Sequence, residues 1–316
     1  MAALPLVVVA DPIDRASVDR LRTGPCRVLD VSAEPASLGT HLADAWGLVV
    51  RSRTKVTADL MAKAPQLKLI ARAGVGLDNI DLPAATKRGI QVVNSPSAAS
   101  ASVAELTVGL YLALLRGLYP AITSTKAGRW ERGTHGHELA GRTVGFVGYG
   151  RIAREVARRL RAFGARTVAY DPFVSAPGDG TEMRTLPETL GGADIVSVHA
   201  ASTPENRHLI NAAAFAAMRP DSYLVNVARG ALIDEAALLG ALNSGRLAGA
   251  ALDVFETEPP TNRALLEHPK VLATPHLGAS TEEGQQRAGT EIVAEVLRVL
   301  GGTAPPATAA TAGVAR

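Results

Sequence analysis

The sequence predicts an α/β protein with two doubly wound domains, each a parallel sheet covered by helices on both faces. Short apolar runs rich in Val, Ile, Leu and Ala alternate with stretches of helical periodicity along the chain. Most of these runs are unbroken, which is typical of strands buried on both faces. A length of 316 residues is enough for about two domains with a core each.

The expected strands form two series separated by a turn-forming cluster at residues 94–97. The first series covers residues 6–9, 47–50, 68–71 and 91–93. The second covers residues 143–147, 167–170, 194–199, 223–227, 249–254 and 271–273. Capping-box spacing at Ser102 to Glu105 and at Ser280 to Glu283 predicts helices that begin there.

The last expected helix, residues 283–300, should return to the first domain and make it discontinuous. The expected bounds are 1–97 for the first part of that domain, 98–282 for the second domain, and 283–316 for the return helix and tail. From about residue 301 the chain is rich in Gly, Ala, Pro and Thr without a core pattern, so we expect disorder there.

Composition and charge argue against several classes of function. Lys and Arg number 33 and Asp and Glu 30, with no block of one sign, so neither nucleic acid nor a membrane surface is expected as a partner.

The N-terminus lacks a basic leader and indicates a first strand, and no uncharged apolar run reaches the roughly 20 residues of a membrane helix. The single cysteine, Cys26, excludes an intrachain disulfide and fits a reducing, cytoplasmic setting. His135 and His137 lack a third ligand, so no metal is expected.

A glycine-rich turn follows the expected strand at residues 143–147. The pattern G-x-G-x-x-A runs from Gly148 through Gly150 to Ala153, where the glycines allow a tight turn and close approach to a pyrophosphate. The helix that starts at Arg151 and Ile152 offers free N–H groups to phosphates.

An acidic residue follows this turn at the spacing of a ribose ligand. Asp171 lies 21 positions after Gly150, at the end of the next expected strand, where it can bind ribose hydroxyls and repel a 2′-phosphate. We therefore expect NAD rather than NADP as cofactor; the alternative is a structural glycine turn with a solvated aspartate.

Three later segments place polar residues directly after expected strands, where open α/β sheets bind ligands. They contain Arg229, Glu258 and His276. An arginine can bind a carboxylate, a histidine can shuttle a proton, and a glutamate can tune that histidine. Taken singly, each has an alternative as a surface ion pair, a solvated acid or a loop histidine.

Five motifs together resemble the D-isomer-specific 2-hydroxyacid dehydrogenase family. They lie at residues 72–81, 148–153, 226–230, 253–259 and 274–278, within a likeness that covers about residues 45–290. The resemblance implies a Rossmann nucleotide domain and a flavodoxin-like, discontinuous substrate domain that closes over the substrate. It also implies hydride transfer between NAD and a 2-hydroxy acid.

The resemblance assigns roles to individual residues. His276 would be the general acid/base, Glu258 would fix its tautomer and favour the imidazolium, and Arg229 would bind the substrate carboxylate and the reacting oxygen. Cofactor contacts would include Ala228, His199 and Asp253, with Asp253 holding the nicotinamide carboxamide. For His199 a packed strand-end histidine is the alternative.

The first domain carries the expected substrate ligands. Val75 and Gly76 can present backbone N–H groups to a carboxylate, and the resemblance places the substrate carboxylate there. The loop containing Arg51 and Arg53 resembles the phosphate-contacting loop of phosphoglycerate dehydrogenases, with Arg132, from a partner subunit, as a third charge. This implies oxidation of 3-phosphoglycerate to 3-phosphohydroxypyruvate in serine biosynthesis; the alternative is a solvated basic loop.

Other interpretations stay open. Residues 97–100 lack the asparagine that phosphoglycerate dehydrogenases commonly carry there, and a reductase of hydroxypyruvate, glyoxylate or another small 2-keto acid is the alternative enzyme. A non-catalytic NAD-sensing interaction protein would give no reason to assemble the three polar residues. The resemblance implies a homodimer through the nucleotide domain, compatible with Leu118, Tyr119 and Trp130, and no serine-sensing domain is expected after the last helix.

Overall fold

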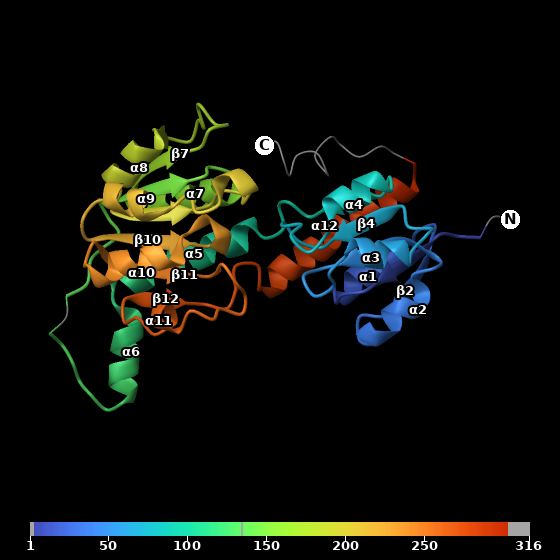
Figure 1. Cartoon of the computed structure of the whole chain (residues 1–316), viewed down its shortest axis with the longest axis horizontal. Helices are drawn as coiled ribbons and strands as arrows, with labels where there is room; N and C mark the ends of the chain where they lie inside the picture. The colour runs from blue at the N-terminus through green and yellow to red at the C-terminus, as the bar shows by residue number, and fades with distance from the viewer. Residues whose placement is uncertain (1–2, 134, 303–316) are drawn as a thin grey trace. The chain divides into compact units, whose positions relative to one another are not determined.

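A computed structural model describes residues 3–133 and 135–302. Contacts divide the chain into unit 1, Met1–Ala99 with Ala279–Arg316, and unit 2, Ser100–Gly278. In Figure 1 unit 1 combines the blue beginning of the chain with its red end, and unit 2 runs from green to orange. The disorder expected from about residue 301 falls on residues 303–316, which lie outside the described residues.

Unit 1 is built on a five-stranded sheet in the order β2-β1-β3-β4-β5, with every neighbouring pair parallel. Its strands are β1 (Leu6–Val9), β2 (Arg27–Asp30), β3 (Ala45–Val50), β4 (Leu69–Arg72) and β5 (Gln91–Asn94). Its helices are α1 (Arg15–Arg22), η1 (Pro35–Ser37), α2 (Leu38–His41), α3 (Ala58–Ala62), α4 (Leu82–Lys87) and α12 (Glu282–Leu300). This is the flavodoxin-like strand order, as expected.

Both faces of this sheet are buried, which explains the unbroken apolar runs of its strands. Val7 packs in one cluster with Leu21 of α1 and Ile292 of α12. The next residue, Val8, points to the opposite face and packs in a second cluster with Met61 of α3. Helix α12 therefore completes the core of unit 1 although 187 residues of chain, 95–281, separate it from β5.

Unit 2 contains a seven-stranded parallel sheet in the order β12-β11-β10-β9-β6-β7-β8. Its strands are β6 (Thr143–Val147), β7 (Arg166–Tyr170), β8 (Glu182–Met183), β9 (Ile195–Val198), β10 (Ser222–Asn226), β11 (Leu247–Leu252) and β12 (Val271–Ala273). The direction of the strand order reverses between β6 and β9. That is the switch point at which Rossmann sheets bind nucleotides, so the predicted fold class is confirmed.

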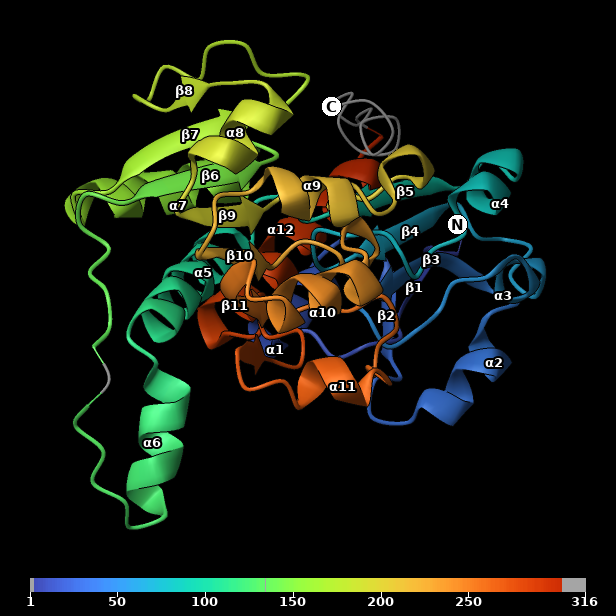
Figure 2. The same ribbon diagram turned by 60° about the vertical axis from the view of Figure 1, so that its left-hand side comes forward.

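Helices α5 (Ser100–Leu115) and α7 (Arg151–Ala162) pack against each other in unit 2. The remaining helices are α6 (Leu118–Lys126), α8 (Leu186–Gly192), η2 (Pro204–Asn206), α9 (Ala212–Ala217), η3 (Gly230–Leu232), α10 (Glu235–Asn243) and α11 (Arg263–Leu266). Figure 2 shows α6 extending away from the sheet of this unit.

Two predicted helix starts and two strands differ from expectation. Helix α5 begins at Ser100, so Ser102 lies within its first turn, and α12 is capped by Thr281 rather than Ser280. The hydroxyl of Thr281 accepts a hydrogen bond from the Gly284 N–H. Strands β2 and β8 were not predicted because β2 is an edge strand with exposed ends and β8 has only two residues.

Within the described part of the chain, no single helix is long and apolar enough to cross a membrane. One bent pair, α5 with α6 at 68°, meets that criterion by length and composition only.

Candidate active site

The glycine-rich turn after β6 has a geometry that only glycine allows at its first position. Gly148 has φ +90°, and a Cβ there would lie 2.5 Å from the Ala200 nitrogen at the end of β9. At Gly150 a Cβ would meet nothing within 4 Å, so the space beside this residue is open. Ala153 is completely buried and lets α7 pack closely. The turn thus has the close approach and the open space that a pyrophosphate needs.

The start of α7 is available to an anion. Gly150 is the residue before the helix and provides no side-chain cap for its first N–H groups. Arg151 is exposed and Ile152 is partly exposed at the same end. The helix is held in place by a buried stripe at a spacing of three and four residues, formed by Ala153, Val156, Ala157 and Leu160. These residues fit a dinucleotide, with the pyrophosphate at the helix N-terminus.

Asp171 follows β7 beside this turn. Its Oδ2 accepts a hydrogen bond of 2.7 Å from the Tyr149 N–H, and its Oδ1 accepts one of 2.8 Å from the Phe173 N–H. The two bonds tie the carboxylate to the glycine-rich turn. Asp171 therefore lies beside the glycine-rich turn, directly after β7.

His199 lies just after β9 and is packed against the sheet. Its Nε2 is 2.8 Å from the Ser197 hydroxyl, and its ring centroid is 5.5 Å from that of Phe146. Burial lowers the pKa of His199 to about 3, so the ring is neutral near pH 7. The ring is thus packed at the end of the strand, and a cofactor contact by His199 would be that of a neutral imidazole.

His276 and Glu258 form a pair beyond the ends of β12 and β11. The distance from His276 Nδ1 to Glu258 Oε2 is 2.8 Å, and both side chains are about half exposed. His276 has φ +55°, a left-handed conformation that is uncommon for a residue with a side chain. Such strain marks positions where a side chain must point in a particular direction. Nε2 is thereby the ring nitrogen left to exchange a proton with a ligand.

Asp253 holds the segment that carries His276. This carboxylate is buried and accepts hydrogen bonds from the Thr274 hydroxyl at 2.6 Å, the Leu277 N–H at 2.7 Å and the Gly278 N–H at 2.8 Å. The His276 N–H also donates to the Asp253 carbonyl at 2.9 Å. In this structure Asp253 shapes the histidine loop, a role that the sequence alone did not reveal.

Arg229 follows β10 on a turn that is shaped by Asn226. The buried Asn226 side chain donates to the Arg229 carbonyl at 2.9 Å and accepts from the Ala228 N–H at 3.0 Å. The next residue, Gly230, packs so closely that a Cβ would lie 1.8 Å from the Phe255 carbonyl carbon. The segment with Arg229 therefore rests directly on the segment that leads to Glu258.

A second set of bonds fastens the Glu258 segment to its neighbours. Glu256 Oε2 lies 2.7 Å from Arg207 Nη2 and 2.9 Å from His208 Nε2, while the Glu256 N–H donates to Glu235 Oε1 at 2.8 Å. The His208 N–H donates to the Ala231 carbonyl beyond Gly230. Burial raises the pKa of Glu256, but the hydrogen bond from His208 and neighbouring contacts outweigh it and lower the pKa overall. Sequence reasoning missed this cluster because Glu256 was assigned no role within its motif, and its partners Arg207, His208 and Glu235 lie outside every motif.

Two loops of unit 1 carry the other expected ligands. Gly74 has φ +150°, and the Asn94 side chain donates to the Val75 carbonyl at 2.6 Å. Across the described residues, the N–H groups of Val75 and Gly76 have no protein acceptor. These donors are therefore available to an anion.

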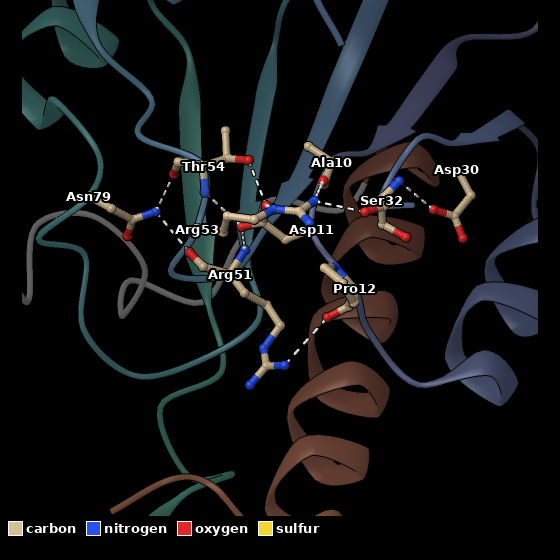
Figure 3. Close-up of polar contacts among 9 residues, drawn as sticks. All are labelled: Ala10, Asp11, Pro12, Asp30, Ser32, Arg51, Arg53, Thr54 and Asn79. Atoms are coloured by element: carbon tan, nitrogen blue, oxygen red, sulfur yellow. Dashed lines mark hydrogen bonds and ion pairs between the residues drawn. The ribbon is translucent and has the colours of Figure 1, made fainter. Parts of the chain in front are cut away.

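The two arginines of the second loop differ sharply. The Arg53 side chain is 43% exposed, but its guanidinium contacts Asp11 Oδ1 at 3.2 Å and the carbonyls of Ala10 and Ser32 (Figure 3). The Arg51 guanidinium points away from that cluster and has only long contacts of 3.4 Å to main-chain and amide oxygens. Arg132 is exposed in unit 2, in the segment after α6, whereas the two loop arginines belong to unit 1.

The chain is similar in sequence and in structure to known proteins. Residues 108–278 match the model of the D-isomer specific 2-hydroxyacid dehydrogenase family, NAD binding domain. The rat D-3-phosphoglycerate dehydrogenase (Rattus norvegicus) is 44% identical over 95% of this chain and 57% of its own length. The chain thus spans somewhat more than half the length of this curated relative.

Solved structures agree with this match. A glyoxylate reductase from Paecilomyes thermophila has a TM-score of 0.85 at 30% identity, covering 95% of this chain and 96% of that one. An NADPH-dependent glyoxylate/hydroxypyruvate reductase from Sinorhizobium meliloti, in complex with NADP and malonate, has a TM-score of 0.82 at 33% identity, covering 94% and 93%. This chain belongs to the D-isomer-specific 2-hydroxyacid dehydrogenase family.

Proposed function

We propose that this protein is an NAD-dependent dehydrogenase of D-2-hydroxy acids that interconverts 3-phosphoglycerate and 3-phosphohydroxypyruvate, a step of serine biosynthesis. One observation carries this proposal: His276 Nδ1 lies 2.8 Å from Glu258 Oε2, and these residues follow strands of the same sheet as the Gly148 turn. A proton-transfer residue and a dinucleotide cradle are the two parts that a hydride-transfer reaction requires.

His276 is the general acid/base of the proposed reaction. Its Nδ1 is held by Glu258, so Nε2 gives a proton to the keto oxygen on reduction and takes it back on oxidation. The Glu258 carboxylate fixes the ring orientation and stabilises the imidazolium form. Arg229 stabilises negative charge on the reacting oxygen and binds the substrate carboxylate.

The nicotinamide cofactor supplies the hydride chemistry, and NAD is the cofactor of this family's nucleotide domain. Gly148, Gly150 and the first N–H groups of α7 would hold its pyrophosphate. Asp171 supports NAD over NADP, because a carboxylate fixed by two backbone N–H groups accepts ribose hydroxyls and repels a 2′-phosphate. We further propose that Arg151, Ile152, Ala228, His199 and Asp253 line the cofactor site.

Unit 1 supplies the proposed substrate ligands. The free N–H groups of Val75 and Gly76 would bind the carboxylate, and Arg51 would bind the phosphate. Arg132 of a partner subunit would add a further positive charge. The 44% identity to a D-3-phosphoglycerate dehydrogenase supports the phosphorylated substrate.

A reductase of hydroxypyruvate or glyoxylate is the second candidate. Its support is the likeness to solved glyoxylate and hydroxypyruvate reductases, together with the engagement of Arg53 by Asp11. In that case Arg51 would be a solvated surface residue.

A direct assay separates the two candidates. Purified protein is mixed with NADH and either 3-phosphohydroxypyruvate or hydroxypyruvate at equal concentration, and absorbance at the NADH band is followed. A higher kcat/KM for the phosphorylated acid supports the proposal. A higher kcat/KM for hydroxypyruvate favours the second candidate, the reductase, in its place. His276→Ala serves as the inactive control; if neither acid is reduced faster than by this variant, both candidates fail.

We also propose a homodimer formed through unit 2. Leu118, Tyr119 and Ile122 of α6 and the nearby Trp130 are exposed, with Trp130 79% accessible, which is costly for apolar side chains in water. Analytical ultracentrifugation tests this, and a monomer at micromolar concentration would rule it out. A cytoplasmic location is proposed from the single, buried cysteine alone.

A further inference from the structure

One buried carboxylate organises the basic loop of unit 1. Asp11, which follows β1, is completely buried and accepts four hydrogen bonds from residues 51–54. They come from the Arg51 N–H at 2.7 Å, the Thr54 N–H at 3.0 Å, the Thr54 hydroxyl at 2.6 Å and Arg53 Nε at 3.2 Å. The loop is therefore fixed at both ends by one side chain (Figure 3).

Arg53 is part of that fixation. Besides Asp11 it donates to the Ala10 carbonyl at 2.5 Å and the Ser32 carbonyl at 3.0 Å. Its donors thus face three acceptors that belong to the protein, one of them a buried charge. Turning Arg53 outward to a ligand would leave the Asp11 carboxylate buried without its counter-charge, which is strongly unfavourable.

Asn79 fixes the same loop from its other side. Its amide nitrogen donates to the Arg51 carbonyl at 2.8 Å and to the Thr54 carbonyl at 2.7 Å. Asn79 lies three residues after Gly76, so the loop with the free N–H groups and the loop with Arg51 are bound together. A carboxylate at one loop and a phosphate at the other would then be held at a set separation.

We propose that Asp11, Arg53 and Asn79 form a rigid frame that positions Arg51 as the phosphate ligand of this loop, at a set distance from the N–H groups of Val75 and Gly76. Arg53 is a positioning residue in this frame and donates no hydrogen bond to the substrate. The proposal refines the substrate site of the proposed function and rests on it. In this proposal, selectivity for a phosphorylated three-carbon acid depends on Asp11, although the Asp11 carboxylate by itself would repel the phosphate.

The test uses Asp11→Asn in the full-length protein, because the two roles of Arg53 predict opposite results. If Arg53 belongs to the frame, loss of the Asp11 charge loosens the loop. KM for 3-phosphohydroxypyruvate then rises about tenfold, while kcat changes less than about threefold. If Arg53 binds phosphate, removing its counter-charge leaves this KM unchanged or lowers it, and the proposal is overturned.

Three further variants make the result specific. Asn79→Asp keeps the size but removes both donors, and it should reproduce the split between KM and kcat. Arg51→Ala should reduce the kcat/KM ratio of the phosphorylated to the unphosphorylated acid by about tenfold or more. Asp59→Asn is the matched control, because this exposed aspartate in the first turn of α3 has no described hydrogen bond to the frame residues. If KM shifts as much in Asp59→Asn as in Asp11→Asn, the effect comes from the loss of any negative charge in this region, and the proposal is refuted.

A binding measurement keeps this test apart from that of the proposed function. If the wild-type protein reduces neither acid, the proposed function fails, and inorganic phosphate binding by calorimetry replaces kinetics. Binding that is lost in both Arg51→Ala and Asp11→Asn supports the frame. Binding that survives in Asp11→Asn, or that is absent in the wild-type protein, overturns it. Circular dichroism of each variant confirms that it is folded.

Discussion

Gly230→Ala should inactivate the proposed enzyme while leaving it folded. Gly230 follows Arg229 as the first residue of η3 and rests on the main chain between Phe255 and Glu256. A Cβ at this position would lie 1.8 Å from the Phe255 carbonyl carbon, where ordinary contact begins at 3.4 Å. The three nearest atoms all belong to the Phe255–Glu256 peptide group, so rotation of a side chain cannot make room.

The structure gives the size of the effect. One of the two segments must move by about 1.6 Å to restore contact, and both carry candidate catalytic residues: Arg229 on one and Glu258 on the other. Misplacing a catalytic group by about 1 Å costs roughly 100-fold in rate. We therefore expect kcat to fall by at least about 100-fold, and the free energy of unfolding to fall by about 1–3 kcal/mol from overpacking.

The assay compares Gly230→Ala with Gly240→Ala. Gly240 lies in α10 of the same unit, and a Cβ there would meet nothing within 4 Å, so its kcat should match that of the wild-type protein. NADH oxidation gives kcat, fluorescence titration gives the NADH affinity, and thermal unfolding gives stability. If Gly230→Ala keeps kcat within threefold, the contact between the two segments does not position the catalytic residues, and the reasoning is refuted.

Three further outcomes are expected. Glu258→Gln keeps the size of the side chain but removes the charge beside His276. We expect kcat to fall about 10- to 100-fold in steady-state kinetics, with little change in NADH affinity in a fluorescence titration. Asp171→Ala should weaken NADH binding and raise the kcat/KM ratio of NADPH to NADH by about tenfold or more, measured with both cofactors. For Asp11, burial raises the pKa of the carboxyl, but hydrogen bonds from the basic loop outweigh burial and lower the pKa overall. The ionised carboxylate therefore stabilises the fold above pH 3.8, and this contribution is lost as the pH falls through the lowered pKa. Acid unfolding followed by circular dichroism should therefore be steeper below about pH 4 in the wild-type protein than in Asp11→Asn.

Each expectation can be contradicted. An unchanged kcat in Glu258→Gln would show that the 2.8 Å contact to His276 has no part in proton transfer. A lower NADPH to NADH ratio in Asp171→Ala would remove the basis for the NAD preference. Identical acid transitions in the wild-type protein and Asp11→Asn would mean that this carboxyl is not held ionised by its neighbours.

The sequence alone determined the fold class and most of the strands. Strand β6 was predicted with its observed bounds, because five buried residues in a row leave a clear apolar run before the glycine turn. Strand β2 was missed, because an edge strand with two exposed ends lacks such a run. Local apolar periodicity therefore located the buried parts of each sheet and failed at the edges.

The motifs also located the candidate site, because the carboxyl ends of parallel strands meet at one edge of a sheet. From this rule Glu258 and His276 were expected near each other, and they lie 2.8 Å apart although 18 residues separate them. The catalytic and cofactor-binding roles of these and the other site residues stay predictions until they are measured. The 2-hydroxyacid dehydrogenase resemblance itself is confirmed by the family match.

Only the tertiary structure showed which partner each charged side chain contacts. Arg51 and Arg53 are two residues apart and chemically identical in the sequence, yet the Arg53 guanidinium pairs with a buried carboxylate that follows β1, whereas the Arg51 guanidinium has only contacts of 3.4 Å to uncharged oxygens. Likewise Asp253, expected at the nicotinamide, is engaged in holding the loop of His276. Motifs record residue type and spacing along the chain. The partner of a charge depends on which distant segments fold against it, because burial makes an unpaired charge far more costly than an exposed one.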